Sequence, residues 1–150
     1  MTDETRVLTD TLTTMLVRRF RAAVYREIES DVGVEVRDGT FPVLTGLLEG
    51  PATATTLGLR GGTDRTTTSR QVSALVRAGL VDRSTDPSDR RNERLALTPA
   101  GRTVAEALRS NAEALVEGAT ARWTDAERTA LATLLPRLVE AIAPPPRRDP

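Results

Sequence analysis

The chain of 150 residues contains no cysteine, no histidine and no lysine, and it has no long apolar run. Without cysteine or histidine it can form no disulfide, no thiol redox switch and no site with the soft ligands that transition metals favour. No apolar segment approaches the roughly 18 residues that a membrane span needs. The start of the chain lacks the basic and apolar regions of a signal peptide. We therefore expect a cytoplasmic protein without a membrane partner.

The same absences argue against an enzyme. No histidine or cysteine is available as a general base or nucleophile, and no glycine-rich phosphate-binding loop is evident. Acidic residues paired with arginine can act in catalysis, but the sequence shows no convergent group of them. We expect no catalytic residues, no metal site and no cofactor.

The net charge of zero conceals an uneven distribution of charge along the chain. Residues 51–101 hold 8 arginines and 5 acidic residues, whereas residues 1–50 hold 6 arginines and 9 acidic residues. A polyanion responds to the local potential rather than to the net charge. The excess is modest, but it makes the middle third the most basic part of the chain.

Apolar periodicity predicts six helices. They span residues 4–30, 40–48, 52–60, 65–78, 99–122 and 125–142. Thr98 is the predicted N-cap of the fifth helix, with Pro99 at its first position, and Thr124-Asp125 caps the sixth. Pro136 should kink or shorten the sixth helix. The third helix, 52–60, is weak because threonine and glycine dominate it.

A β-hairpin is predicted between the fourth and fifth helices. Two β-type runs, 80–85 and 93–97, flank the turn sequence DPSD, which leads into Arg90-Arg91. Proline, aspartate and serine are typical of turns, so the tip of this hairpin carries two arginines. Helix, turn, helix and hairpin is the order of a winged helix-turn-helix domain.

The helix at 65–78, capped by Asp64, is predicted to have two distinct faces. Thr68, Val72 and Leu75 lie on one face at 100° per residue. The opposite face and its flanks carry the predicted DNA-contacting residues Thr66, Thr67, Ser69, Arg70 and Ser73. A guanidinium can make a bidentate guanine contact worth roughly 1–3 kcal/mol, and hydroxyls suit thymine methyls or phosphates. Such a surface is also typical of an ordinary solvated helix, but its position beside an arginine-tipped hairpin favours DNA binding.

The hairpin tip allows two interpretations. Asp89, Arg90 and Arg91 can form a surface ion-pair cluster of little consequence, worth under ~1 kcal/mol. Alternatively, one arginine enters the minor groove while Asp89 orients its guanidinium. Arg83 and Arg94, on the strands, are expected to meet phosphates or acidic neighbours.

Residues 72–102, VSALVRAGLVDRSTDPSDRRNERLALTPAGR, resemble the wing region of the MarR family of bacterial transcriptional regulators. The shared elements are Gly79-Leu80-Val81, Asp89-Arg90-Arg91, Leu97-Thr98 and Gly101. The resemblance implies a single mainly α (α+β) unit: a winged helix-turn-helix lobe at 36–101, dimerisation helices at 1–35 and 102–143, and a disordered tail at 144–150. It implies a homodimer on double-stranded DNA with a pseudo-palindromic operator. Arg91 would be the minor-groove arginine, Asp89 its support and Arg90 a phosphate contact.

The chain departs from the family pattern in the third helix. Gly58 replaces a small apolar residue and Gly61 replaces a leucine, which suggests a loose or differently packed turn. By resemblance, the function is that of a repressor released by a small-molecule effector, often phenolic in this family. The alternative is a winged-helix protein-interaction module without DNA binding. Tyr25, Phe41 and Trp123 are candidate ligand contacts, although such residues are more often part of the core, and no pocket residue is assigned.

Overall fold

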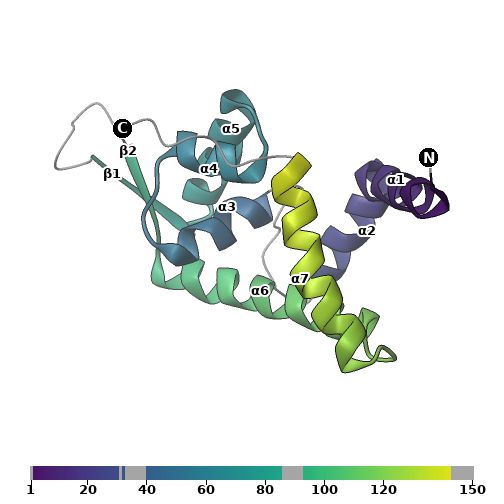
Figure 1. Ribbon diagram of the computed structural model, residues 1–150. Helices are drawn as coiled ribbons and strands as arrows, with labels where there is room; N and C mark the ends of the chain where they lie inside the picture. The colour runs from purple at the N-terminus through teal and green to yellow at the C-terminus, as the bar shows by residue number, and fades with distance from the viewer. Residues whose placement is uncertain (1, 31, 33–39, 86–92, 143–150) are drawn as a thin grey trace. The chain divides into compact units, whose positions relative to one another are not determined.

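The computed structural model describes residues 2–30, 32, 40–85 and 93–142. The chain forms two compact units, Met1–Ala112 and Glu113–Pro150. The elements follow along the chain (Figure 1) as α1 Asp3–Leu16, α2 Arg18–Ile28, α3 Thr40–Gly46, the 3-10 turn η1 Leu47–Glu49, α4 Ala54–Gly61, α5 Arg65–Arg77, β1 Val81–Thr85, β2 Glu93–Leu97, α6 Pro99–Ala119 and α7 Asp125–Ile142. Within these residues the single sheet is an antiparallel hairpin, β1 with β2. This mainly helical architecture confirms the predicted fold class.

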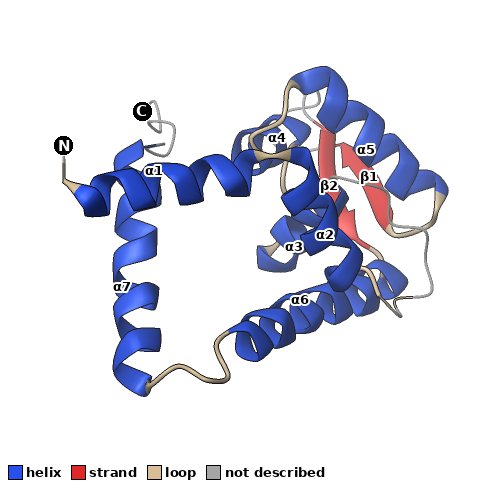
Figure 2. Cartoon of the chain, turned by 90° about the vertical axis from the view of Figure 1, so that its right-hand side faces the viewer, coloured by secondary structure: helices blue, strands red, loops and turns tan. Residues whose placement is uncertain are grey.

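The core of the first unit forms where α3, α4 and α5 pack with the hairpin and the first half of α6 (Figure 2). Its buried apolar side chains are Ile28, Val43, Leu44, Leu47, Leu57, Val72, Leu75, Leu80, Val81, Leu95, Val104, Ala105 and Leu108. Full burial of a leucine or valine contributes roughly 1.5–3 kcal/mol relative to exposure. Thr68, Val72 and Leu75 are all buried, so the inward face predicted for helix 65–78 is confirmed.

The hairpin is anchored at its inner end. Val81 pairs with Leu97 and Arg83 with Leu95. Ala52 extends this pairing, because its N–H and carbonyl bond the Leu95 carbonyl and N–H at 3.0 and 2.9 Å. This bridge also explains why α4 begins at Ala54 rather than at Ala52, as predicted from sequence.

The loop into α6 is held by one side chain. The Thr98 hydroxyl accepts from the Gly101 N–H at 2.9 Å and donates to the Gly79 carbonyl at 2.7 Å. The predicted N-cap at Thr98 is therefore confirmed. In the second unit, the Thr124 hydroxyl accepts from the Glu127 N–H, so the predicted start of α7 is also confirmed.

The predicted single helix at 4–30 is wrong, because Val17 interrupts it. Val17 has extended backbone angles, φ −67° and ψ 140°, and separates α1 from α2. No proline or glycine stands there, so no residue of the usual helix-breaking types marks this interruption in the sequence. The far end of α2 is fixed in the first unit: Ile28 is buried, and the Asn111 side-chain amide of α6 donates to the Ile28 and Ser30 carbonyls at 2.9 and 3.0 Å.

Of the two effects expected of Pro136, a kink or a shorter last helix, the shortening does not occur. Helix α7 runs through Pro136 to Ile142. None of its 18 residues is buried within the chain, although Leu131, Leu134 and Leu135 lie on one side of it. No described helix is long and apolar enough to cross a membrane.

Candidate nucleic-acid interface

The turn between α4 and α5 sets the position of the candidate recognition helix, α5. A Cβ at Gly58 would lie only 2.8 Å from the Thr68 Oγ1 and 3.1 Å from the Thr63 carbonyl, so glycine permits this close approach. The Thr68 hydroxyl lies 2.8 Å from the Thr63 hydroxyl and 3.0 Å from the Asp64 carbonyl. Gly62 takes a left-handed conformation, φ +62°. The turn is therefore closely packed rather than loose, and hydroxyl groups link its two helices.

Helix α5 begins at the predicted N-cap, Asp64. One carboxylate oxygen accepts from the Thr67 N–H at 2.9 Å and the other from the Thr67 hydroxyl at 2.7 Å. These two hydrogen bonds stabilise the ionised form and hold the pKa of Asp64 below its ordinary value. The carboxylate also lies at the positive end of the helix dipole.

The five predicted DNA-contacting residues all lie on the outward side of α5. Thr66, Ser69 and Arg70 are exposed, and their side chains form no hydrogen bond or ion pair in the described part of the chain. Thr67 and Ser73 are half-buried. The Thr67 hydroxyl donates to the Asp64 carboxylate, and the Ser73 hydroxyl accepts from the Arg83 guanidinium. Free hydroxyls and a guanidinium on one exposed face can read base edges and phosphates.

Arg83, the middle residue of β1, joins the hairpin to α5. Its guanidinium donates to the Ser73 hydroxyl at 2.9 Å and pairs with the Glu93 carboxylate of β2 at 3.2 Å. The expected acidic neighbour of Arg83 is thus Glu93. The predicted tip residues Asp89, Arg90 and Arg91 lie outside the described residues.

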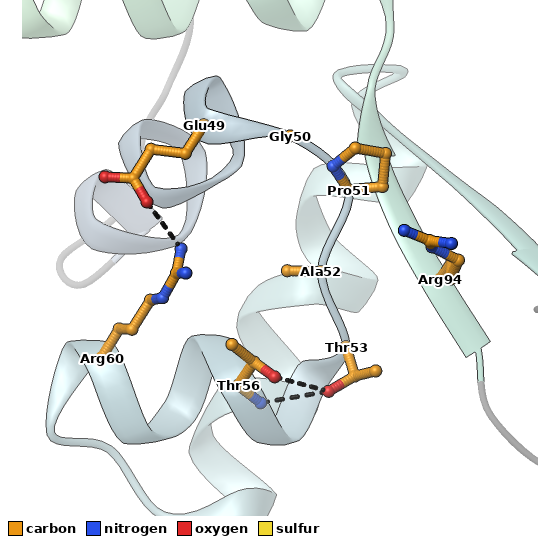
Figure 3. Close-up of a pocket in the computed structure, with 8 residues that line it drawn as sticks. All are labelled: Glu49, Gly50, Pro51, Ala52, Thr53, Thr56, Arg60 and Arg94. Atoms are coloured by element: carbon orange, nitrogen blue, oxygen red, sulfur yellow. Dashed lines mark hydrogen bonds and ion pairs between the residues drawn. The ribbon is translucent and has the colours of Figure 1, made fainter. Parts of the chain in front are cut away.

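A polar cavity of about 340 Å³ opens between the start of α4 and β2 (Figure 3). Its lining is Glu49, Gly50, Pro51, Ala52, Thr53, Thr56, Arg60 and Arg94. Thr53 caps α4 by accepting from the Thr56 N–H at 3.1 Å, and Arg60 pairs with Glu49 at 3.1 Å. The N-terminal turn of α4, at the positive end of its dipole, and the nearby Arg94 suit the backbone of a nucleic acid. The Thr53–Thr56 pair was the sequence signal for this cap.

A second cavity, of about 270 Å³, lies among α2, α3 and the α4–α5 turn. Its lining is Arg18, Arg21, Ala22, Tyr25, Pro42, Gly61, Gly62 and Thr63. Arg18 and Arg21 form no ion pair with any described residue, and the Tyr25 ring stands 6.3 Å from the Phe41 ring. A Cβ at Gly61 would lie 3.5 Å from Pro42, so the glycine leaves this wall of the cavity open. The sequence had indicated Tyr25 as a candidate ligand contact, whereas Arg18 and Arg21, which precede it on the same helix, were missed.

Comparison with known proteins shows which family this chain belongs to. The sequence profile of the MarR family matches residues 33–92. A protein of Thauera aromatica described as a transcriptional regulatory protein for the hcr operon is 32% identical over 81% of this chain and 75% of its own. The chain belongs to the MarR family.

Solved structures of MarR-type regulators agree in fold with this one. A MarR family transcription regulator is 32% identical, with 93% of each chain covered and a TM-score of 0.76. The PcaV transcriptional regulator of Streptomyces coelicolor, solved with its natural ligand, is 31% identical over 83% of this chain and 89% of its own, with a TM-score of 0.66. The chain is therefore a DNA-binding transcription regulator of winged-helix type.

The cap of the recognition helix gives a testable pH dependence. Because the pKa of Asp64 is lowered on folding, its stabilising effect is present above the ordinary value of 3.8 and is lost as the pH falls through the lower folded value. Asp64→Ala should lower the thermal unfolding midpoint at pH 7. Asp64→Asn keeps an N-cap acceptor without titrating, so it should retain most of the stability and lose this acid dependence.

Melting curves of the three proteins between pH 7 and pH 2.5 check this prediction. If Asp64→Ala melts like the wild type at pH 7, the cap does not stabilise α5.

Proposed function

We propose that this MarR-family chain is a repressor that binds a pseudo-palindromic operator as a homodimer and is released by a small aromatic effector. The outward face of α5, where Arg70 is exposed together with the hydroxyls of Thr66 and Ser69, carries the proposal. This face enters the major groove, and Arg70 contacts a guanine edge. The hairpin tip follows the adjacent minor groove through Arg91, supported by Asp89, while Arg90 contacts phosphate.

In this proposal residues 36–101 form the DNA-binding lobe, and residues 1–35 and 102–143 form the dimer. Exposed apolar side chains on the helices outside the lobe support the division. They include Val7, Leu8, Met15 and Leu16 on α1, Val116 on α6, and Leu131, Leu134, Leu135, Val139 and Ile142 on α7. Helix α7 buries nothing within its own chain, so a second copy is the partner that removes this surface from water. Two-fold symmetry places the half-sites about one helical turn (~10 bp) apart.

The cavity among α2, α3 and the α4–α5 turn is the proposed effector site. Arg18 and Arg21 supply two guanidinium groups that form no ion pair with the residues the structure describes, and Tyr25 supplies an aromatic wall. This combination suits a hydroxylated aromatic carboxylate, because guanidinium groups pair with carboxylates in forked geometry. The ligand-bound structure of the related PcaV regulator supports a small-molecule effector. The effector lowers DNA affinity only if it prefers the spacing of the lobes that cannot bind DNA.

The salt dependence of DNA binding tests the proposed function. Fluorescence anisotropy with duplexes from the promoter region of its own gene should show affinity that falls by about 10³–10⁵-fold between 50 and 200 mM salt, if 6–10 phosphates are contacted. A footprint should show two equivalent halves related by a two-fold axis. Absence of binding even at 50 mM salt would favour the protein-interaction module instead.

Arg18→Ala should weaken the response to the effector without weakening DNA binding. The loss of a charge-assisted hydrogen bond, about 1.5–3 kcal/mol, raises the effector concentration for half-release by roughly tenfold or more. Arg26→Ala is the matched control, because Arg26 is exposed on the same helix and does not line the cavity. Release of labelled operator is titrated with a series of hydroxybenzoates. Equal half-release concentrations for the wild type and Arg18→Ala would exclude this cavity as the effector site.

A further inference from the structure

We infer that Arg83 is a positioning residue that sets the angle of the wing against the recognition helix by joining Ser73 of α5 to Glu93 of β2. This inference rests on the proposed function, because it concerns how the two DNA-reading elements are held together. We refer to Ser73, Arg83 and Glu93 as the wing clamp.

The hairpin register explains how Arg83 reaches α5. Arg83 pairs with Leu95, so both side chains stand on the same face of the hairpin. Leu95 is fully buried, which shows that this is the face that packs on the lobe. The Arg83 stem therefore runs along the lobe, and its guanidinium meets the Ser73 hydroxyl at 2.9 Å and the Glu93 carboxylate at 3.2 Å.

The clamp lies where apolar anchoring of the hairpin ends. Val81 and Leu95 are buried at the inner end, whereas Ser84, Thr85 and Glu93 are exposed at the outer end. A two-stranded hairpin without such packing is only marginally stable in water. The hydrogen bond from Arg83 to Ser73 joins the hairpin to α5 just before the segment that carries the tip. The angle at which β1 and β2 leave the lobe is therefore set in part by this hydrogen bond.

The clamp geometry disfavours a direct phosphate contact by Arg83. Its side chain is 34% exposed, the smallest value among the arginines of the described ion pairs, which otherwise range from 45 to 68%. Both terminal nitrogens already donate to protein oxygens. Moving the guanidinium to a phosphate would break these bonds and leave the Glu93 carboxylate uncompensated beside the polyanion. Arg83 thus neutralises the Glu93 carboxylate and also holds the hairpin against α5.

The clamp also gives Ser73 a role different from the base contact predicted from sequence. Its hydroxyl oxygen is the acceptor for Arg83, and the residue is half-buried between α5 and β1. Ser73 then acts on DNA through the wing, while Thr66, Ser69 and Arg70 remain the residues available for direct contact.

A double-mutant cycle with the tip arginine tests the clamp. Operator affinity is measured for the full-length wild type, Arg83→Met, Arg91→Ala and the double variant; methionine keeps the apolar stem of Arg83. We expect each single change to weaken binding by about tenfold, and the double variant to be no weaker than Arg91→Ala, because a misplaced tip has no contact left to lose. Arg77→Met, which removes an exposed arginine from the end of α5, should instead add its effect to that of Arg91→Ala.

Footprinting separates positioning from general damage to the fold. In Arg83→Met, minor-groove protection at the outer edges of the operator should fade, while purine N7 protection in the major groove persists. Ser73→Ala and Glu93→Gln should show the same pattern with losses of about two- to fivefold, since each removes one part of the clamp. If Arg83→Met melts far below the wild type, these two milder variants carry the test.

Additive losses in the cycle, together with a shallower salt dependence for Arg83→Met, would show that Arg83 contacts phosphate itself and would overturn the inference. Unchanged operator affinity in Arg83→Met would also overturn it. Failure of the wild type to bind any operator would instead reject the proposed function.

Discussion

Replacing Gly101 by alanine is expected to prevent the chain from folding stably. A Cβ at this position would lie 1.8 Å from the Leu80 carbonyl oxygen and 2.7 Å from its carbon. Both are backbone atoms, so no side-chain rotation relieves the overlap. The Leu80 carbonyl also accepts from the Thr98 N–H at 3.1 Å, so moving it would break the start of α6. We expect a loss of at least about 3 kcal/mol, a large part of the 5–15 kcal/mol that is typical of a domain.

Gly118→Ala is the matched control for this experiment. Gly118 lies in the same helix, and a Cβ there would meet nothing within 4 Å. Alanine should therefore stabilise α6, by up to about 1 kcal/mol, because it loses less backbone entropy on folding. Urea unfolding followed by circular dichroism compares the three proteins. A Gly101→Ala midpoint equal to that of the wild type would mean that α6 stands farther from Leu80 than described.

Leu134→Glu is expected to abolish the homodimer and with it tight operator binding. Leu134 is 56% exposed within one chain and lies on the apolar side of α7, the surface proposed to be covered by a second copy. An unpaired carboxylate in that interface would be strongly unfavourable. A monomer reads one half-site, so the gain from linking two lobes, about 10²–10⁴ in affinity, is lost.

Thr133→Glu provides the control, since position 133 faces the opposite side of α7 and is exposed. It should leave both the mass in solution and the operator affinity near wild-type values. Sedimentation equilibrium gives the mass, and anisotropy gives the affinity. A Leu134→Glu protein that remains dimeric would place the dimer contact elsewhere on the chain.

The elements that could be predicted from sequence are those with local causes. Asp64 and Thr98 are N-caps in the structure because a side-chain oxygen next to a free N–H needs no distant partner. The faces of α5 follow from helical spacing alone, and the hairpin follows from its turn residues. These features indicate the winged-helix class, and they place the residues that we propose to contact DNA on the exposed face of α5.

The features that could not be predicted depend on contacts between distant residues. Val17 interrupts a helical pattern that contains no proline or glycine, and the structure gives no local reason for the break. Ala52 leaves the predicted third helix because it pairs with Leu95, 43 positions away.

The candidate site also has parts that follow from local sequence patterns and parts that depend on distant contacts. The predicted contacts on α5 rest on position in a helix, and they stay predictions until DNA binding is measured. The clamp joins Ser73 to Arg83 across a hairpin whose angle no local pattern specifies. The proposed effector cavity requires Arg18 and Gly61 to line one space, which depends on how α2 packs on the lobe.

The first turn of helix α2 carries positive charges at the positive end of the helix dipole, which is unfavourable. Its first turn carries arginines and no acidic residue, and no side chain caps it. The free protein therefore retains a local repulsion that dissolved anions relieve, divalent sulfate and phosphate more than chloride. Melting temperatures recorded in different buffers at equal ionic strength will differ for this reason, and phosphate-buffered titrations will understate the strength of any carboxylate ligand.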